Sequence, residues 1–266
     1  MGVAPDDGRE RRTRTISHGG EQIYAEATGS GPVVVFCHGL GGNHAIWWRQ
    51  VDAFARDHTV ITWDQRGFGN STASTGQAGI EEAADDLVAV LKAFGVDQAH
   101  LVGQSMGAFV ALRFALRYPR LVSSLVLSTT LAAADPALTR GLLAAVPQRQ
   151  LRDRHAVLSE QFADGNPELA VLYNQISSFG TKPPIAAMLE SMATEVFSDR
   201  DLGVLECPVL CVAAERDRFC PPDAMQAVAA RLPRAKFVVL AGAEHSAYYE
   251  RPHEWNSAVL EFLAIA

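Results

Sequence analysis

The sequence predicts an α/β fold with a mainly parallel sheet and one helical insertion. Apolar runs of strand length, rich in β-branched residues, recur along the chain with helical patterns between them. Such alternation implies right-handed strand–helix–strand crossovers. Residues 131–203 break the rhythm, because they contain helical patterns and several prolines but no convincing strand. We therefore expect an α/β core at residues 15–130 and 204–266, with residues 131–203 forming a helical cap.

The individual elements follow from local patterns. Residues 13–27 predict a hairpin whose turn is His18-Gly19-Gly20. Six later strands are expected at residues 32–39, 58–64, 99–104, 121–129, 208–215 and 235–242. Helices are expected at about 81–94, 106–118, 222–231 and 252–265.

Composition narrows the class of protein. The 266 residues suffice for one large domain, and the formal net charge of -7 disfavours a nucleic-acid partner. The four cysteines are too few for a disulfide framework in a chain this long, which favours reduced thiols and a cytoplasmic location. No apolar stretch reaches the ~18 residues of a membrane span. Residues 1–14 lack the apolar core of a signal peptide, so we expect a flexible tail there. We expect a small-molecule substrate, no membrane partner, and a monomer or homodimer.

A glycine-flanked serine stands at a sharp transition. In LVGQSMGAFV (101–110), Ser105 follows a buried strand and directly precedes a helix. Such a turn strains the serine backbone, and residues two before and two after must be small; Gly103 and Gly107 satisfy this G-x-S-x-G pattern. The turn would raise the Ser105 hydroxyl above the carboxyl edge of the sheet, which predicts a nucleophile.

A serine nucleophile needs a base, and the base needs an orienting acid. His245 lies in AGAEHS, just after the last expected strand, and is our choice of base. Asp217 follows the strand before it and is our choice of acid, with Glu215 second and Asp135 a distant third. His38 lies among glycines that favour a loop-shaping role, and the role of His44 stays open.

The oxyanion of the reaction needs backbone donors near Ser105. We expect them from the Leu40 N–H in the HGLGG loop (38–42) and from the Met106 N–H at the start of the helix. The same glycines do not form a nucleotide fingerprint, because His44 stands where G-x-G-x-x-G requires its third glycine. No metal motif such as H-E-x-x-H is present, so neither cofactor nor metal is expected.

Substrate contacts are the least determined part of the site. Candidates are taken from the expected loops and from the apolar residues of 131–203: His38, Gly39, Trp47, Gln104, Phe179 and Met188. Most apolar residues of that segment should pack in the interior, with a minority facing substrate. Few charges there could anchor a carboxylate, which favours uncharged, mostly apolar acyl groups.

The chain resembles the α/β-hydrolase superfamily in five motifs taken together. They are the G-x-S-x-G turn at Ser105, known as the nucleophile elbow, the HGLGG loop (38–42), DQRGFGNS (64–71), ERD and GAEHS. The order Ser105, Asp217, His245 matches the order of its catalytic triad. The resemblance implies an eight-stranded sheet whose second strand is antiparallel. It also implies that Asp64, Arg66 and Gly67 form a structural turn rather than part of the catalytic site.

The resemblance implies acyl transfer by a serine hydrolase acting on an ester or lactone of small to medium size. Dehalogenases and epoxide hydrolases of this fold use Asp at the elbow, so Ser105 disfavours both. A carbon–carbon hydrolase of ring-cleavage products and a cofactor-free perhydrolase stay open as alternatives. So does a different class, a small-molecule receptor with little turnover.

Overall fold

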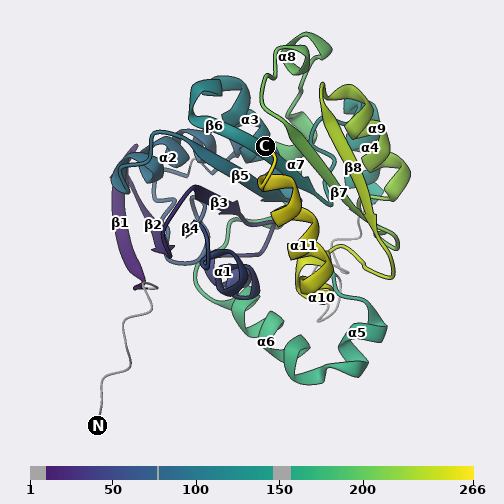
Figure 1. The fold of residues 1–266 in the computed structure, drawn as a ribbon, viewed down its shortest axis with the longest axis horizontal. Helices are drawn as coiled ribbons and strands as arrows, with labels where there is room; N and C mark the ends of the chain where they lie inside the picture. Colours follow the sequence, from purple (N-terminus) through teal and green to yellow (C-terminus); the bar gives the residue numbers. More distant parts are fainter. Residues whose placement is uncertain (1–9, 77, 146–156) are drawn as a thin grey trace.

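The computed structural model describes residues 10–76, 78–145 and 157–266. Its centre is an eight-stranded sheet in the order β1-β2-β4-β3-β5-β6-β7-β8, with helices on both faces (Figure 1). The strands are β1 (Arg12–His18), β2 (Glu21–Thr28), β3 (Val33–Cys37), β4 (Thr59–Trp63), β5 (Ala99–Gln104), β6 (Val122–Ser128), β7 (Val209–Ala214) and β8 (Ala235–Leu240). All the expected strands are present.

The second strand is the one that reverses direction. β2 pairs antiparallel with both β1 and β4, whereas every pairing from β4 to β8 is parallel. This confirms the topology that the resemblance implied. The β1–β2 hairpin closes through Gly19 and Gly20, both at positive φ, as a two-residue hairpin turn requires. Residues 1–9 of the expected tail lie outside the described residues, and β1 begins within that tail, because Arg12 pairs with Ala27.

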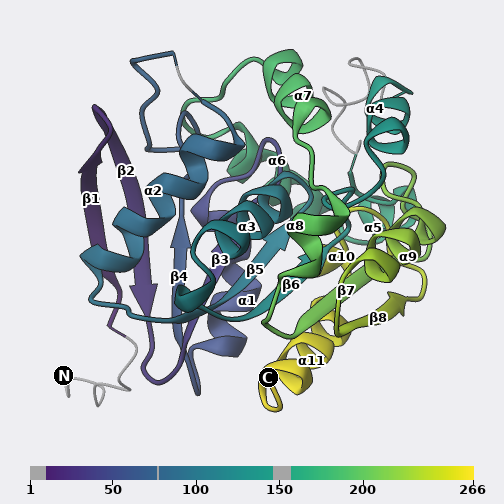
Figure 2. The ribbon, with the colours of Figure 1, turned by 90° about the horizontal axis from the view of Figure 1, so that it is seen from above.

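Helices pack on the two faces of the sheet (Figure 2). Val35 and Cys37 of β3 face the core under α2 (Ile80–Ala93), α3 (Met106–Arg117) and α9 (Pro222–Arg231). Their neighbours Val34 and Phe36 face the core under α1 (Trp48–Phe54) and α11 (Pro252–Leu263). Because both faces of β3 are buried, its sequence is a continuous apolar run rather than an alternating one.

Neither α1 nor the 3-10 turn before it, η1 (His44–Trp47), was expected from the sequence. These elements are too short to show a helical period. They are stabilised by packing, since the rings of Trp47 and Phe54 both contact the ring of Phe36 and lie close to Trp255. The short α10 (Ala247–Glu250) was missed for the same reason.

Helices also make up the described part of the inserted segment, residues 131–203. They are α4 (Pro136–Ala145), α5 (Glu160–Gly165), α6 (Pro167–Ser178), α7 (Ile185–Thr194) and α8 (Asp199–Gly203). Within its described residues this segment adds no strand to the sheet. Polar contacts fasten it to the core: Arg113 of α3 pairs with Glu195, and the Arg231 guanidinium donates to the carbonyls of Ala133 and Phe197.

The D-Q-R-G turn is held by buried charges. Arg66 donates two hydrogen bonds to Asp86 of α2, at 2.8 and 2.6 Å, and both side chains are buried. Asp64 accepts from the backbone N–H of His44 at 2.6 Å, and its Oδ1 lies 2.7 Å from His44 Nδ1. His44, whose role was open, therefore connects this turn to the loop after β3. The implied structural role of Asp64 and Arg66 agrees with these contacts.

All four cysteines are unpaired. Among the helices of the described residues, none combines the length and the apolar character that crossing a membrane requires.

Candidate active site

Four loops converge at the carboxyl edge of the sheet. Leu40 follows β3, Ser105 follows β5, Asp217 follows β7 and His245 follows β8. The chain runs from β3 to β4 and then crosses to β5 on the other side of β3. Ligands of open α/β sheets bind at such a switch point, and here the proposed nucleophile and oxyanion loop lie on either side of it.

The backbone of Ser105 is strained. Its φ of 52° and ψ of -117° lie in a region that L-residues rarely adopt, at a typical cost of about 1–3 kcal/mol. Two contacts hold it: the Ser105 N–H donates to the Ser128 carbonyl at 2.9 Å, and the Thr130 hydroxyl donates to the Ser105 carbonyl at 2.9 Å. Of residues 101–110, only Ser105 is not buried. The turn therefore exposes one side chain in an otherwise buried stretch.

The two flanking glycines are required by close backbone approaches. A Cβ on Gly103 would collide with the Gly107 carbonyl and the Ala108 backbone. A Cβ on Gly107 would collide with the Cys37 carbonyl at the end of β3. The pattern recognised in the sequence thus has a steric cause: α3 starts directly against the ends of β5 and β3.

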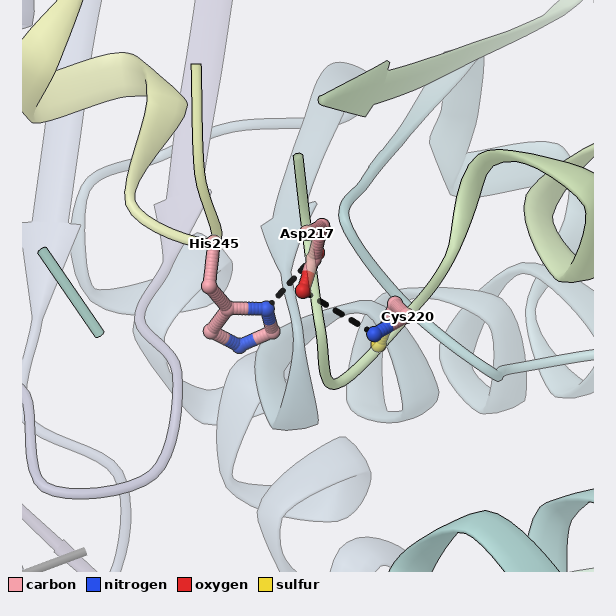
Figure 3. A group of neighbouring side chains, drawn as sticks. All are labelled: Asp217, Cys220 and His245. Carbon is pink, nitrogen blue, oxygen red and sulfur yellow. Dashed lines mark hydrogen bonds and ion pairs between the residues drawn. The ribbon is translucent and has the colours of Figure 1, made fainter. Parts of the chain in front are cut away.

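His245 and Asp217 form a buried pair. His245 Nδ1 lies 2.9 Å from Asp217 Oδ2, and the side chain of Asp217 is fully buried. Figure 3 shows the second ring nitrogen of His245 pointing away from the carboxylate. The other carboxylate oxygen, Oδ1, accepts from the Phe219 and Cys220 N–H groups at 2.8 and 3.0 Å. A carboxylate only accepts, so Nδ1 is the donor and the far nitrogen Nε2 can accept a proton.

The other two acid candidates lie elsewhere. Glu215 is exposed and accepts from the Gly242 N–H at 2.7 Å. Asp135 is also exposed and accepts from the Ala137 N–H at the start of α4. Of the three carboxylates considered, the structure therefore brings only Asp217 to His245.

Ser105 and His245 both line one cavity of about 60 Å³ between the core and the inserted segment. Within the described residues, the hydroxyl of Ser105 has no hydrogen-bond partner; such contacts often tighten only when substrate binds. The lining residues carry no full charge apart from any on His245: Leu40, Gln104, Ser105, Phe109, Thr130, Leu131, Leu143, Val157, Tyr173, Leu189, Met192, Phe219, Cys220, His245 and Ser246. A more open hollow of about 400 Å³ between α4 and α7 shares Leu143 and Leu189 with it. The cavity thus has an apolar, largely uncharged wall and a neighbouring hollow lined partly by Arg140 and Glu190.

The expected oxyanion donors lie beside this cavity. Leu40 lines it, in a loop that turns through a hydrogen bond from the Gly42 N–H to the Gly39 carbonyl at 3.0 Å. Met106 is the first residue of α3, so its N–H has no intrahelical partner. Both N–H groups are therefore in the right segments, and their role as donors stays a prediction.

Only some of the expected substrate contacts reach the cavity. Gln104 lines it, and Gly39 lies directly behind the Gln104 amide oxygen. Trp47 is fully buried against Phe36 and Tyr248 instead. Phe179 is 52% exposed, in the turn after α6, and Met188 is buried in the core while its neighbour Leu189 lines the wall. The faces of these apolar side chains depend on how the inserted helices dock, which the sequence pattern does not specify.

His38 also lies outside the cavity lining and shapes the loop. Its Nδ1 is 2.9 Å from the Gly39 carbonyl, and its Nε2 accepts from the Gln65 N–H at 3.1 Å. Complete burial lowers the pKa of His38 from 6.5 to about 4. The ring therefore stays neutral and connects the loop after β3 to the D-Q-R-G turn.

Gln104 joins three segments of the site. Its amide nitrogen donates to Thr129 Oγ1 at 3.0 Å and to the His245 carbonyl at 3.2 Å. Thr129 Oγ1 donates to the same carbonyl at 3.0 Å. The residue before the nucleophile thus holds the backbone of the proposed base while its oxygen packs against Gly39.

Several cavity residues were not anticipated from the sequence. Thr130 directly follows an expected strand and Ser246 directly follows His245, so position after a strand and beside the proposed base was an available signal. Tyr173 of α6, by contrast, is one of the apolar residues of 131–203 of which a minority was expected to face substrate; it lines the cavity and its hydroxyl lies 3.1 Å from Ser246 Oγ.

A donor set for a metal ion exists beside the triad. Figure 3 shows the side chains of Asp217, Cys220 and His245 side by side. Each offers one ligand atom, these three atoms lie within 4.8 Å of one another, and all three residues are buried. Burial and the nearby Asp217 carboxylate raise the pKa of the Cys220 thiol well above its ordinary value.

Comparison with known proteins agrees with this architecture. Residues 32–252 match the sequence profile described as the alpha/beta hydrolase fold. The chain belongs to this family. A relative from Azorhizobium caulinodans, named "Putative carbamate hydrolase RutD", is 30% identical, and the match covers 92% of this chain and 97% of the relative. The similarity to named hydrolases along nearly the whole chain places it among the hydrolases.

Two solved structures are similar over nearly their whole length. A thermophilic esterase from Thermogutta terrifontis is 28% identical with a TM-score of 0.82, covering 96% of this chain and 98% of the esterase. Est816, described as an N-acyl homoserine lactone degrading enzyme, is 26% identical with a TM-score of 0.78, covering 94% and 100%.

The buried His38 predicts a pH-dependent stability. The unfolded chain binds a proton at this residue below pH 6.5, but the folded chain does so only below about 4. Stability is therefore lost as pH falls through this window, by about 3 kcal/mol for a shift of this size. Urea unfolding of wild type and His38→Gln between pH 7 and 4 should show a shallower loss in the variant, whatever its stability at pH 7. Equal slopes would contradict this.

Substitution of Gln104 tests whether this residue positions His245 or binds the substrate. Gln104→Leu keeps the volume but removes both donated hydrogen bonds, so we expect kcat to fall about tenfold through misplacement of His245, with KM little changed. Gln98→Leu, an exposed position before β5, is the matched control and should leave both constants unchanged. A change confined to KM would assign Gln104 to substrate binding instead.

Proposed function

We propose that the protein is a serine hydrolase that cleaves a small, uncharged ester or lactone through an acyl-enzyme intermediate. The observation that carries the proposal is that Ser105 and His245 line the same cavity, with His245 held by Asp217. A serine in an ordinary surface turn would not require a strained backbone, and a histidine that only packs in the core would not require a buried carboxylate partner. The two features together favour a catalytic role.

In the proposed first step, His245 Nε2 takes the proton of the Ser105 hydroxyl while the oxygen attacks the substrate carbonyl. Asp217 keeps the Nδ1 proton in place and stabilises the imidazolium that forms. The tetrahedral oxyanion lies between the Leu40 and Met106 N–H groups, each contributing about 3 kcal/mol to the transition state. His245 then returns its proton to the leaving alkoxide.

In the second step, water replaces the leaving group. His245 removes a proton from this water, and the hydroxide attacks the acyl carbonyl of Ser105. Collapse of the second tetrahedral intermediate releases the carboxylic acid and restores the serine. The inserted segment acts as a cap in this scheme, because α6 and α7 supply Tyr173 and Leu189 to the cavity wall.

The wall of the cavity supports the substrate class. Its described residues include no Lys, Arg, Asp or Glu, so a charged acyl group would lose hydration without a partner. The cavity volume of about 60 Å³ favours short acyl chains. The similar esterase and lactone-degrading enzyme support an ester or lactone carbonyl.

The four unpaired cysteines fit a reducing compartment, and we place the reaction in the cytoplasm.

Carbamate hydrolysis is the second candidate, favoured by the relative that is 30% identical and bears that activity in its name. The same nucleophile would attack the carbamate carbonyl and form a carbamoyl-enzyme. The carbonyl of a carbamate is less electrophilic than that of an ester. Comparing the hydrolysis rates of an ester and of a carbamate therefore distinguishes an esterase from a carbamate hydrolase.

The proposal predicts that Ser105 and His245 act as a unit. Ser105→Ala and His245→Ala should each lower kcat by about 10⁴-fold or more, and the double variant should lose little beyond either single one. Steady-state release of p-nitrophenol from acetate, butyrate and octanoate esters measures this. The two shorter esters should exceed octanoate in kcat/KM by about tenfold.

The same assay distinguishes the alternatives. If the fold-losses in kcat of the two single variants multiply in the double variant, the two residues act independently and the shared mechanism is contradicted. A single burst without turnover would indicate a binding protein. Full activity on a ring-cleavage product with none on esters would indicate carbon–carbon hydrolysis, and peroxide-dependent peracid formation would indicate a perhydrolase.

A further inference from the structure

The proposed mechanism leaves one metal-binding type of side chain in the cavity unused, the thiol of Cys220. Cys220 lines the cavity and is 5% exposed, and among the described residues its sulfur has no hydrogen-bond partner. Its backbone N–H donates to Asp217 Oδ1, which keeps the residue next to the carboxylate (Figure 3). A buried, unpartnered thiol thus lies beside the acid–base pair.

The three side chains offer a mixed set of donors. A carboxylate oxygen of Asp217, the sulfur of Cys220 and a ring nitrogen of His245 lie within 4.8 Å of one another. Sulfur and imidazole nitrogen are the ligands that Zn²⁺ and Cd²⁺ prefer, and Ca²⁺ and Mg²⁺ avoid them. We propose that Asp217, Cys220 and His245 form an inhibitory binding site for a thiophilic divalent cation.

Charge balance supports such an occupant. A dication bound by the Cys220 thiolate and the Asp217 carboxylate gives a site with no net charge. The cavity beside it carries no Lys, Arg or additional acid among its described residues. Such a neutral assembly avoids leaving an uncompensated charge in a buried place. A water molecule from the cavity can complete four-coordinate geometry.

Binding would remove the base that the proposed function requires, and in that respect the inhibition rests on that proposal. The cation bonds to His245 Nδ1, the nitrogen that faces Asp217, so the Nδ1 proton moves to Nε2. The Cys220 thiol releases one proton to solvent as its sulfur bonds to the metal. With a hydrogen on Nε2, His245 cannot accept the Ser105 proton, and acyl transfer stops.

Cadmium tests the site without any need for turnover. Ser105→Ala protein, titrated with Cd²⁺ alone, should develop the ultraviolet charge-transfer absorption of a cadmium–thiolate bond with one equivalent bound. Adding Cys220→Ala, or separately His245→Gln, should weaken binding by more than the about tenfold typical of losing an outer-shell partner. Adding Cys207→Ala, a half-buried thiol before β7, should leave the titration unchanged. Equal titration in the Cys220→Ala protein would overturn the site.

Inhibition is measured separately on otherwise wild-type protein. Zn²⁺ should abolish hydrolysis of p-nitrophenyl acetate, and EDTA should restore it. The Cys220→Ala variant should need at least about tenfold more Zn²⁺ for half inhibition of its own basal rate. Cd²⁺ binding without any ester hydrolysis would leave the site standing and overturn the proposed function. If wild type and Cys220→Ala are both active and equally sensitive to Zn²⁺, the inhibitory role of this site is overturned.

Discussion

The backbone turn at Ser105 is the constraint on which the site depends. A chain that passes from β5 into α3 without a loop must adopt a positive φ at the corner, and Ser105 adopts it although it is not glycine. The strain persists because the surroundings leave no alternative: β6 holds the Ser105 N–H, and the glycines on either side touch neighbouring backbone. This one turn presents a hydroxyl at the sheet edge and starts α3 directly after it, so that the first N–H groups of the helix follow the serine.

The remaining parts of the site are built around that corner by buried polar contacts. His38 and His44 connect the loop after β3 to the D-Q-R-G turn, and Arg66 fixes that turn to α2 through Asp86. Gln104 joins the corner to the carbonyl of His245. Each of these groups would be costly to leave unpaired, so the loops are held in one arrangement rather than several. The catalytic geometry that we propose is therefore a consequence of how the core satisfies its buried polar groups.

The sequence predicted the sheet well because strands buried on both faces have a local signature, as in VVVFC of β3. The elbow was equally readable, since two obligatory glycines flank Ser105. The pairing of Asp217 with His245 could be predicted because both residues follow strands whose carboxyl ends must meet. Trp47, Phe179 and Met188 were expected at the substrate but lie elsewhere, since an apolar residue can face core, cavity or solvent within the same pattern. α1 was missed because its few residues carry no period, and the proximity of Cys220 to His245 depends on a loop turn that only three-dimensional structure shows.

The most direct test of this account is the site of covalent attack. Wild-type protein treated with a fluorophosphonate, which reacts with activated serines, is digested with trypsin and examined by mass spectrometry. The tryptic peptide 93–113 contains one hydroxyl-bearing side chain, that of Ser105. We predict a single phosphonyl adduct on this peptide, formed far more slowly when His245 is replaced by alanine. An unmodified peptide, or an adduct on another serine, would contradict it.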